Sequence, residues 1–158
     1  MSILETHRLT WPNEAACAAT ATALAQGAPL RAAFIELHGP LGAGKTTFVR
    51  HLLHALGVQG RVKSPTYAVM EPYELPGGAI WHFDFYRFND PQEWEDAGFR
   101  DVFASTGLKL AEWPEKAAEF LPPADLRIHI EPHGDEARAV TFHACSPLGV
   151  ALLSRLWP

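Results

Sequence analysis

The stretch IELHGPLGAGKTTFVRHLL, Ile35 to Leu53, passes from an apolar segment through a glycine-rich turn into a second apolar segment. Four of its residues match the phosphate-binding pattern G-x-x-x-x-G-K-[ST]: Gly39, Gly44, Lys45 and Thr46. Residues 32–38 before the turn form the apolar run of a strand, and residues 45–56 after it have the apolar spacing of a helix. A strand, a glycine-rich loop and a helix in this order predict a phosphate-binding loop, or P-loop.

The backbone of this loop is expected to bind the phosphates of a nucleotide. Glycines allow the chain to curl so that successive N–H groups point inward, and the positive end of the following helix adds to their attraction for phosphate. The ammonium of Lys45 can reach the β- and γ-phosphates, and the hydroxyl of Thr46 can bind Mg²⁺. The guanine-selecting motif N-K-x-D is absent from the sequence, which favours adenine, so the expected cofactors are ATP and Mg²⁺. The residues assigned to the loop contacts are Leu41, Gly42, Ala43, Gly44, Lys45, Thr46 and Thr47.

Composition is typical of a soluble globular protein, and a single domain is expected over residues 1–158. The 18 acidic residues outnumber the 13 lysines and arginines, which gives a net charge of −5. No overall basic field therefore attracts nucleic acid, so contact with RNA is expected only through a partner or a local patch. Cys17 and Cys145 lie far apart without zinc-site spacing, and we find no signal peptide or membrane-spanning run. These features predict a cytoplasmic protein with no membrane partner.

The rest of the chain mixes helix patterns with hairpin patterns. Helices are predicted at residues 12–27, 91–98 and 114–120, and a short amphipathic tail at 149–157. Strands are predicted at residues 64–74 and 79–88, at 108–113, and at 125–132 and 137–144. The first pair is joined by the turn LPGG and the last by HGDE, which favours two hairpins. An order that begins as α/β and becomes rich in hairpins predicts a mixed sheet.

Two predicted strands end in an acid that could complete a nucleotide site. Asp84 ends the segment IWHFD, and Glu112 ends LKLAE. The carboxyl edge of a parallel sheet is where ligands bind, so both carboxylates are expected beside the loop. For each acid, a ligand role and a solvated position at a strand end both stay open.

The segment KSPTY, residues 63–67, supplies two hydroxyls, those of Ser64 and Thr66. In nucleotide switches such a turn lends a threonine to Mg²⁺ or to the γ-phosphate, whereas the alternative here is the start of a strand. Arg87 could pair with phosphate or only extend along a strand end. Trp113 could stack on a ligand or pack in the core.

The eight histidines do not define a metal site by their spacing. His51 and His54 lie three residues apart on a predicted helix, and His82 shares a strand face with Asp84. Spacing places no third ligand beside either pair, so structural or exposed roles are favoured.

Four segments resemble, in order and spacing, the TsaE family, the small bacterial ATPases of tRNA threonylcarbamoyladenosine synthesis. They are GPLGAGKTTFVR (39–50), VKSPTYAVMEPY (62–73), HFDFYR (82–87) and LAEWPE (110–115). The similarity covers nearly the full chain. It implies a P-loop NTPase-like α/β fold, with a mixed sheet whose central parallel strands are flanked by antiparallel strands and with helices on both faces.

The resemblance also implies roles for the candidate residues. Thr46 and Glu112 would hold Mg²⁺. Asp84 would be required for hydrolysis, by orienting water, with Lys45 as the second catalytic residue. The nucleotide-binding set then gains the switch-like residues and the tryptophan next to the metal acid: Ser64, Thr66 and Trp113.

The biological role implied by the resemblance is ATP binding and hydrolysis that acts on a TsaD–TsaB complex and resets it between turnovers. Hydrolysis would be slow without these partners, and tRNA would be involved only indirectly. The residues alone leave two alternatives open. One is a small-molecule or nucleoside kinase, against which the scattered single arginines count, because such kinases close an arginine-rich lid. The other is a nonenzymatic nucleotide switch with KSPTY as its sensor.

Overall fold

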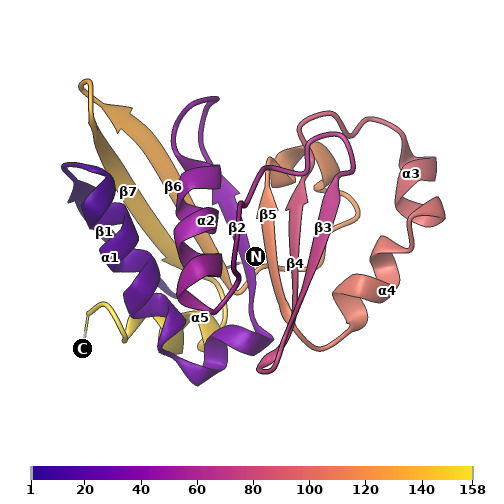
Figure 1. Ribbon diagram of the computed structural model, residues 1–158, viewed down its shortest axis with the longest axis horizontal. Coiled ribbons are helices and arrows are strands. Elements are labelled where there is room, and N and C mark those ends of the chain that lie inside the picture. The colour runs from indigo at the N-terminus through magenta and orange to yellow at the C-terminus, as the bar shows by residue number, and fades with distance from the viewer. Residues whose placement is uncertain (1, 158) are drawn as a thin grey trace.

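The computed structural model describes residues 2–157, in which one seven-stranded sheet carries the helices (Figure 1). Its strands are β1 (Glu5–Trp11), β2 (Phe34–His38), β3 (Met70–Leu75), β4 (Gly78–Asp84), β5 (Leu108–Glu112), β6 (Leu126–His133) and β7 (Ala137–Ala144). Its α-helices are α1 (Glu14–Ala25), α2 (Lys45–Ala55), α3 (Pro91–Asp96), α4 (Phe99–Ala104) and α5 (Pro147–Leu153). Two short 3₁₀ helices are η1 (Ala28–Ala32) and η2 (Pro114–Ala117).

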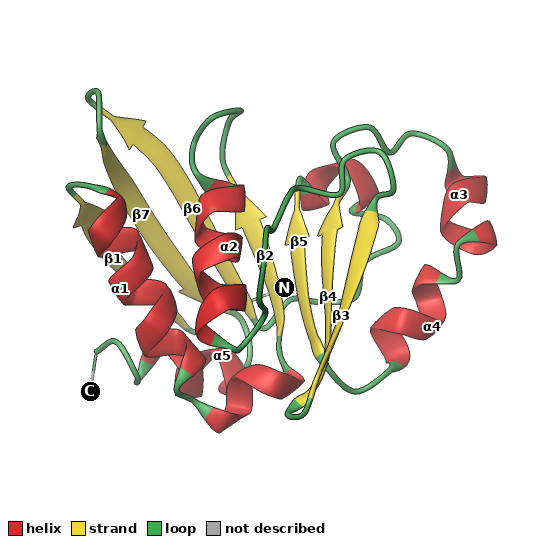
Figure 2. Ribbon diagram, in the orientation of Figure 1, coloured by secondary structure: helices red, strands yellow, loops and turns green. Residues whose placement is uncertain are grey.

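The strand order is β1-β7-β6-β2-β5-β4-β3 (Figure 2). β2 pairs in parallel with both β6 and β5, and β5 pairs in parallel with β4. The outer pairs, β1 with β7, β7 with β6 and β3 with β4, are antiparallel. The predicted mixed sheet, with central parallel strands flanked by antiparallel ones, is confirmed.

Helices pack on both faces of this sheet, as predicted. On one face, α1 and α2 lie over the strands, where Phe48 and Leu52 of α2 join Ile35 and Leu37 of β2 in one core (Figure 1). On the other face, α3 and α4 pack around an aromatic core. Its buried rings are Phe34, Phe83, Phe85, Phe88, Trp94 and Phe99. The five residues of β5 are all buried, as expected for a central strand covered on both faces.

The two faces of β6 differ in chemistry. Ile128 and Ile130 point into the core beneath α1 and α2, whereas Arg127 and His129 alternate to the opposite side. There His129 stacks on the ring of His38 of β2, with 4.6 Å between ring centres. This half of the sheet is therefore apolar on one face and polar on the other.

The first predicted hairpin is shorter than expected. Its first strand begins at Met70 rather than at residue 64, and its second ends at Asp84 rather than at residue 88. The hydroxyls of Ser64 and Thr66 bind the carboxylate of Asp84, and Val69 takes a left-handed φ of 69° that turns the chain. The segment before Met70 is therefore a loop held against the sheet, which excludes the alternative that KSPTY begins a strand.

Strand β1 and helix α4 were not predicted from the sequence. β1 pairs along its whole length with β7, and only Trp11 of the seven residues is buried. Its polar side chains, such as Thr6 and Arg8, alternate with half-buried ones, so the segment has no apolar run that marks a strand. The predicted helix at 12–27 is confirmed, with the side chain of Asn13 accepting a hydrogen bond from the N–H of Ala16 at 3.0 Å.

Candidate functional site

The P-loop connects the carboxyl end of β2 to α2 (Figure 1). Gly39, Gly42 and Gly44 have φ values of 149°, 77° and 107°, which glycine adopts without the steric cost that other residues incur. A Cβ at Gly39 would lie 2.3 Å from the carbonyl oxygen of Ile130. The glycines of the motif are therefore a requirement of this backbone path.

A cavity of about 350 Å³ opens beside the loop. The residues assigned a nucleotide-binding, metal-binding or catalytic role from the sequence all line it: Leu41, Gly42, Ala43, Gly44, Lys45, Thr46, Thr47, Ser64, Thr66, Asp84, Glu112 and Trp113. Tyr86 and Arg138 also line it and were not predicted. Arg87, also considered from the sequence, does not line the cavity, and its guanidinium lies 4.8 Å from the ring centre of Tyr67.

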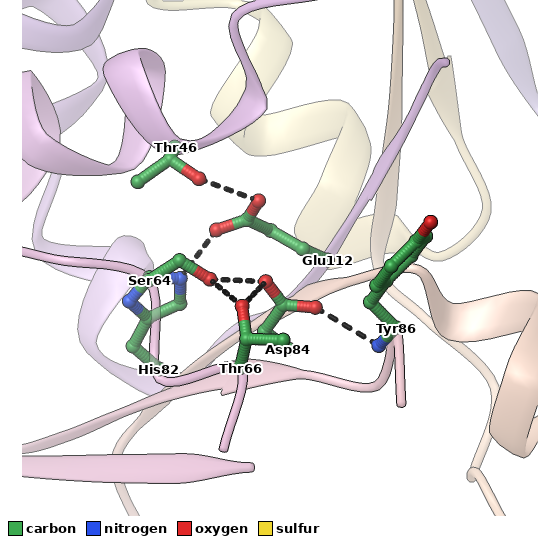
Figure 3. Close-up of polar contacts among 7 residues, drawn as sticks. All are labelled: Thr46, Ser64, Thr66, His82, Asp84, Tyr86 and Glu112. Atoms are coloured by element: carbon green, nitrogen blue, oxygen red, sulfur yellow. Dashed lines mark hydrogen bonds and ion pairs between the residues drawn. The ribbon is translucent and has the colours of Figure 1, made fainter. Parts of the chain in front are cut away.

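Glu112 lies at the centre of one polar chain (Figure 3). Its Oε1 accepts a hydrogen bond from Oγ1 of Thr46 at 2.8 Å, and its Oε2 accepts one from Nε2 of His82 at 2.7 Å. Glu112 is only 2% exposed. Burial of a carboxylate is costly unless its oxygens are hydrogen-bonded, and here both oxygens have partners.

Asp84 lies beside Glu112, because the two residues are register partners at the ends of β4 and β5. Its Oδ2 accepts hydrogen bonds from the hydroxyls of Ser64 and Thr66, the latter at 3.1 Å (Figure 3). Its Oδ1 accepts one from the backbone N–H of Tyr86 at 2.9 Å. The loop that carries KSPTY is thus tied to the acid at the end of β4.

Lys45 is buried within the loop. Its ammonium donates a hydrogen bond to the carbonyl of Gly39 and lies 3.4 Å from the ring centre of Trp113. Burial lowers the pKa of Lys45, and the nearby carboxylates of Glu112, Glu115 and Asp84 oppose that shift. A cation held over an aromatic face at this distance is attracted by the ring. Trp113 takes a left-handed φ of 55°, uncommon for a residue other than glycine.

Arg138, on β7, supports the loop from outside. Its Nε donates a hydrogen bond to the carbonyl of Ala43 at 2.7 Å, so a loop carbonyl is satisfied by a side chain rather than turned toward a ligand. No local signal could have identified this residue, since its partner lies 95 positions away in the chain.

The acid and the hydroxyl that meet at the loop are oxygen donors of the type that Mg²⁺ prefers. Mg²⁺ in nucleotide sites uses one or two protein carboxylates and completes its shell with phosphate and water oxygens. Thr46 and Glu112 fit this donor set. Among residues 2–157, no group of three or more His, Cys, Asp or Glu side chains is arranged to hold a metal. His51 and His54 bind separate partners, Glu14 and the carbonyl of Gly60.

The central parallel strands, the loop at their carboxyl edge and the acids that end β4 and β5 define a P-loop α/β protein. Within the described residues, no helix has both the length and the apolar character needed to cross a membrane.

The family follows from comparison with known proteins. The family model for "Threonylcarbamoyl adenosine biosynthesis protein TsaE" matches residues 11–140. The tRNA threonylcarbamoyladenosine biosynthesis protein TsaE of Haemophilus influenzae is 44% identical over 124 residues, which are 78% of this chain and 78% of that protein. The TsaE protein of Bacillus subtilis is 39% identical over 110 residues, 70% of this chain and 68% of that one. The chain belongs to the TsaE family.

A solved structure shares the fold. The crystal structure of Bacillus subtilis YdiB superposes with a TM-score of 0.77 at 28% identity, covering 99% of this chain and 97% of that one. The family links the chain to tRNA threonylcarbamoyladenosine biosynthesis.

Proposed function

We propose that this protein binds ATP and Mg²⁺ in the P-loop cavity and hydrolyses the ATP as part of tRNA threonylcarbamoyladenosine biosynthesis. The observation that carries the proposal is the 2.8 Å hydrogen bond between Oγ1 of Thr46 and Oε1 of Glu112. P-loop NTPases hold their metal between a loop hydroxyl and an acid on a neighbouring strand. Here that hydroxyl and that acid are already in contact, and a second acid lies on the adjoining strand end.

Thr46 and Glu112 would hold the Mg²⁺, which when bound neutralises charge on the phosphates. The ammonium of Lys45 would exchange the carbonyl of Gly39 for phosphate oxygens. That exchange moves the cation from a neutral acceptor to an anionic one, which strengthens its hydrogen bond.

Asp84 would orient the attacking water. Its Oδ2 accepts hydrogen bonds from Ser64 and Thr66, and the two hydroxyl oxygens lie 3.1 Å apart. If these hydroxyls turn toward a γ-phosphate, Oδ2 becomes free to accept a hydrogen bond from water. The same movement would therefore detect the phosphate and prepare the acid.

A nucleoside attached to phosphates in this loop also has space to occupy. A second cavity of about 260 Å³ shares Ala43, Gly44 and Thr47 with the first and extends toward Trp11 and Asn13. This cavity lies at the N-terminal ends of α1 and α2, next to the P-loop. It would accommodate the base of a nucleotide whose phosphates are bound by the loop. This supports a nucleotide rather than a free phosphate as the ligand.

The partner in this proposal is a complex of TsaD and TsaB, in the cytoplasm, with tRNA reached only through that complex. The family assignment and the net charge of −5, which does not attract RNA, support it. Hydrolysis would be slow in the isolated protein, because closure of the Ser64–Thr66 loop around the γ-phosphate would depend on partner binding.

The test measures ATP turnover by the purified protein alone and after addition of purified TsaD and TsaB. We expect the partners to raise the rate. Asp84→Ala should still bind them yet fail to support repeated tRNA modification. If the partners bind without changing the rate of ATP turnover, or if Asp84→Ala supports many rounds of tRNA modification, the proposal of an ATPase would give way to that of a nonenzymatic switch. Transfer of phosphate to an added small acceptor would indicate a kinase.

A further inference from the structure

His82 occupies a position where its strand otherwise supplies apolar side chains. It lies on β4 on the same face as Ile80, which belongs to the core beneath α2, and its register partner is Leu110 of β5, in the same core. The side chain of His82 is fully buried, at 0% exposure. A polar ring in this place is expected to have a hydrogen-bond partner, because burying an unpaired polar group costs stability.

The ring has one polar contact among the described residues. Nε2 donates to Oε2 of Glu112 at 2.7 Å, while Nδ1 is buried without a hydrogen-bond partner (Figure 3). A side chain that only filled this space would do so at lower cost without the two nitrogens. The contribution of the His82 ring at this position is therefore its hydrogen bond to Glu112.

That contact fixes the orientation of the carboxylate. With Oε2 held from below by His82, Oε1 is left to face Thr46 at the loop. Without the donor, Oε2 would be a buried carboxylate oxygen with no partner, and the group would gain by rotating toward the hydroxyl or the cavity. The side chain of Glu112 can be directed at a metal only while one of its oxygens is held elsewhere.

We propose that His82 is the positioning residue of the magnesium site: it holds Oε2 of Glu112 so that Oε1 and the Thr46 hydroxyl present a preformed pair of ligands. The inference rests on the proposed function, because it presupposes that Glu112 binds Mg²⁺. It predicts that loss of the donor weakens the magnesium dependence of nucleotide binding and leaves metal-free nucleotide binding almost unchanged. Hydrogen-bond partners of metal ligands typically change metal affinity by about 10- to 100-fold when removed.

Two amide substitutions separate this role from packing. His82→Gln places a side-chain N–H₂ near the position of Nε2 and can still donate to Glu112, whereas the shorter His82→Asn cannot reach it. Both put a neutral amide in the same buried space. His129→Asn is the matched control, because His129 lies on the opposite face of the sheet and does not line the cavity.

The experiment titrates each protein with an ADP analogue carrying a fluorescent N-methylanthraniloyl group, first in EDTA and then over a series of Mg²⁺ concentrations. Circular dichroism and thermal unfolding confirm that each variant is folded. We expect His82→Asn to need at least roughly 10-fold more Mg²⁺ than the wild type for the half-maximal effect of Mg²⁺ on binding of the analogue. His82→Gln should lie near the wild type, and His129→Asn should match it.

Two results would overturn the inference. One is a folded His82→Asn with the magnesium requirement of the wild type. The other is an equal loss in His82→Gln and His82→Asn, which would show that the ring acts through packing. A wild-type protein that binds the analogue without any response to Mg²⁺ would instead remove the metal site from the proposed function, so the two failures are distinguishable.

Discussion

Lys45 carries a positive charge that lies buried within the P-loop. It is 5% exposed, and among residues 2–157 its partners are the carbonyl of Gly39 and the ring of Trp113. Burial lowers the pKa of its ammonium, so the fold gains little from this charge. In the proposed function, the ammonium instead binds the phosphates of the nucleotide.

Lys45→Ala should therefore lose nucleotide affinity without losing the fold. A hydrogen bond to a charged group contributes about 1.5–3 kcal/mol, which corresponds to roughly 10- to 100-fold in Kd. Isothermal titration calorimetry with ATP measures the affinity, and urea denaturation checks the stability. Unchanged affinity in a folded Lys45→Ala would contradict the assignment of the loop.

Asp84 and Glu112 should differ in kind when each is replaced by alanine. Glu112→Ala removes the proposed metal ligand, so the magnesium dependence of nucleotide binding should weaken. Asp84→Ala should leave binding largely intact and lower turnover, because the carboxylate is proposed to orient the attacking water. Glu119→Ala, an exposed acid outside the cavity, serves as the control. The reverse pattern would mean that the two roles are exchanged.

Among the elements, helix α5 is attached to the sheet with very little space. The hydroxyl of Ser146, its N-cap, donates to Oδ1 of Asp125 at 2.7 Å and accepts from the N–H of Gly149 at 3.1 Å. A Cβ at Gly149 would lie 1.9 Å from the carbonyl oxygen of Asp125. The glycine therefore permits the close approach of the helix to Asp125, the residue that precedes β6.

Gly149→Ala should destabilise the protein although alanine is the better helix former. The propensity gain is about 1 kcal/mol, but overpacking typically costs about 1–3 kcal/mol, and a clash with backbone lies at the upper end. We expect a net loss of about 1–2 kcal/mol in the free energy of unfolding, measured by urea denaturation. Ala151→Gly, an exposed position of the same helix, reports the propensity term alone. Increased stability of Gly149→Ala would refute the close contact.

At the scale of the whole molecule, the polar face of the sheet should make stability depend on pH. The pKa of His129 is lowered to about 4, first by burial and then by its neighbours His38, His143 and Arg127, with Glu36 opposing them. Its ordinary value is 6.5, so between these limits the unfolded chain binds more protons than the native protein. The contribution is fully present above about pH 6.5 and is lost as the pH falls toward about 4.

Urea denaturation at about pH 7 and about pH 5 should show this loss, and His129→Asn should reduce it. We expect the loss in the free energy of unfolding between these two pH values to be about 1–2 kcal/mol larger in the wild type than in the variant. This is less than the full pKa shift implies, because the ring is partly solvated. The pKa of His143 is also lowered by burial, so some pH dependence persists in the variant. An equal loss of stability in the two proteins would show that His129 does not cause the pH dependence.

The local elements near the site were predictable, because their signals lie within a few residues of sequence. Three glycines, a lysine and a threonine next to an apolar strand specify the loop, and an acid at the end of an apolar strand marks Asp84 and Glu112. The sequence did not predict β1 or α4, and it wrongly predicted a strand for the segment before Met70. Their structure depends on partners far along the chain, such as β7 for β1 and Asp84 for Ser64.

By itself the sequence determined the loop, the strand–helix order around it and the mixed sheet, and it placed two candidate acids at strand ends, since each follows from short-range spacing and side-chain chemistry. Only the tertiary structure decided which groups complete the site. Arg138 reaches the loop from β7, and His82 reaches Glu112 across 30 positions of sequence. Such contacts arise from strand order and register, and a histidine in an apolar strand looks the same in sequence whether it packs in the core or holds a carboxylate.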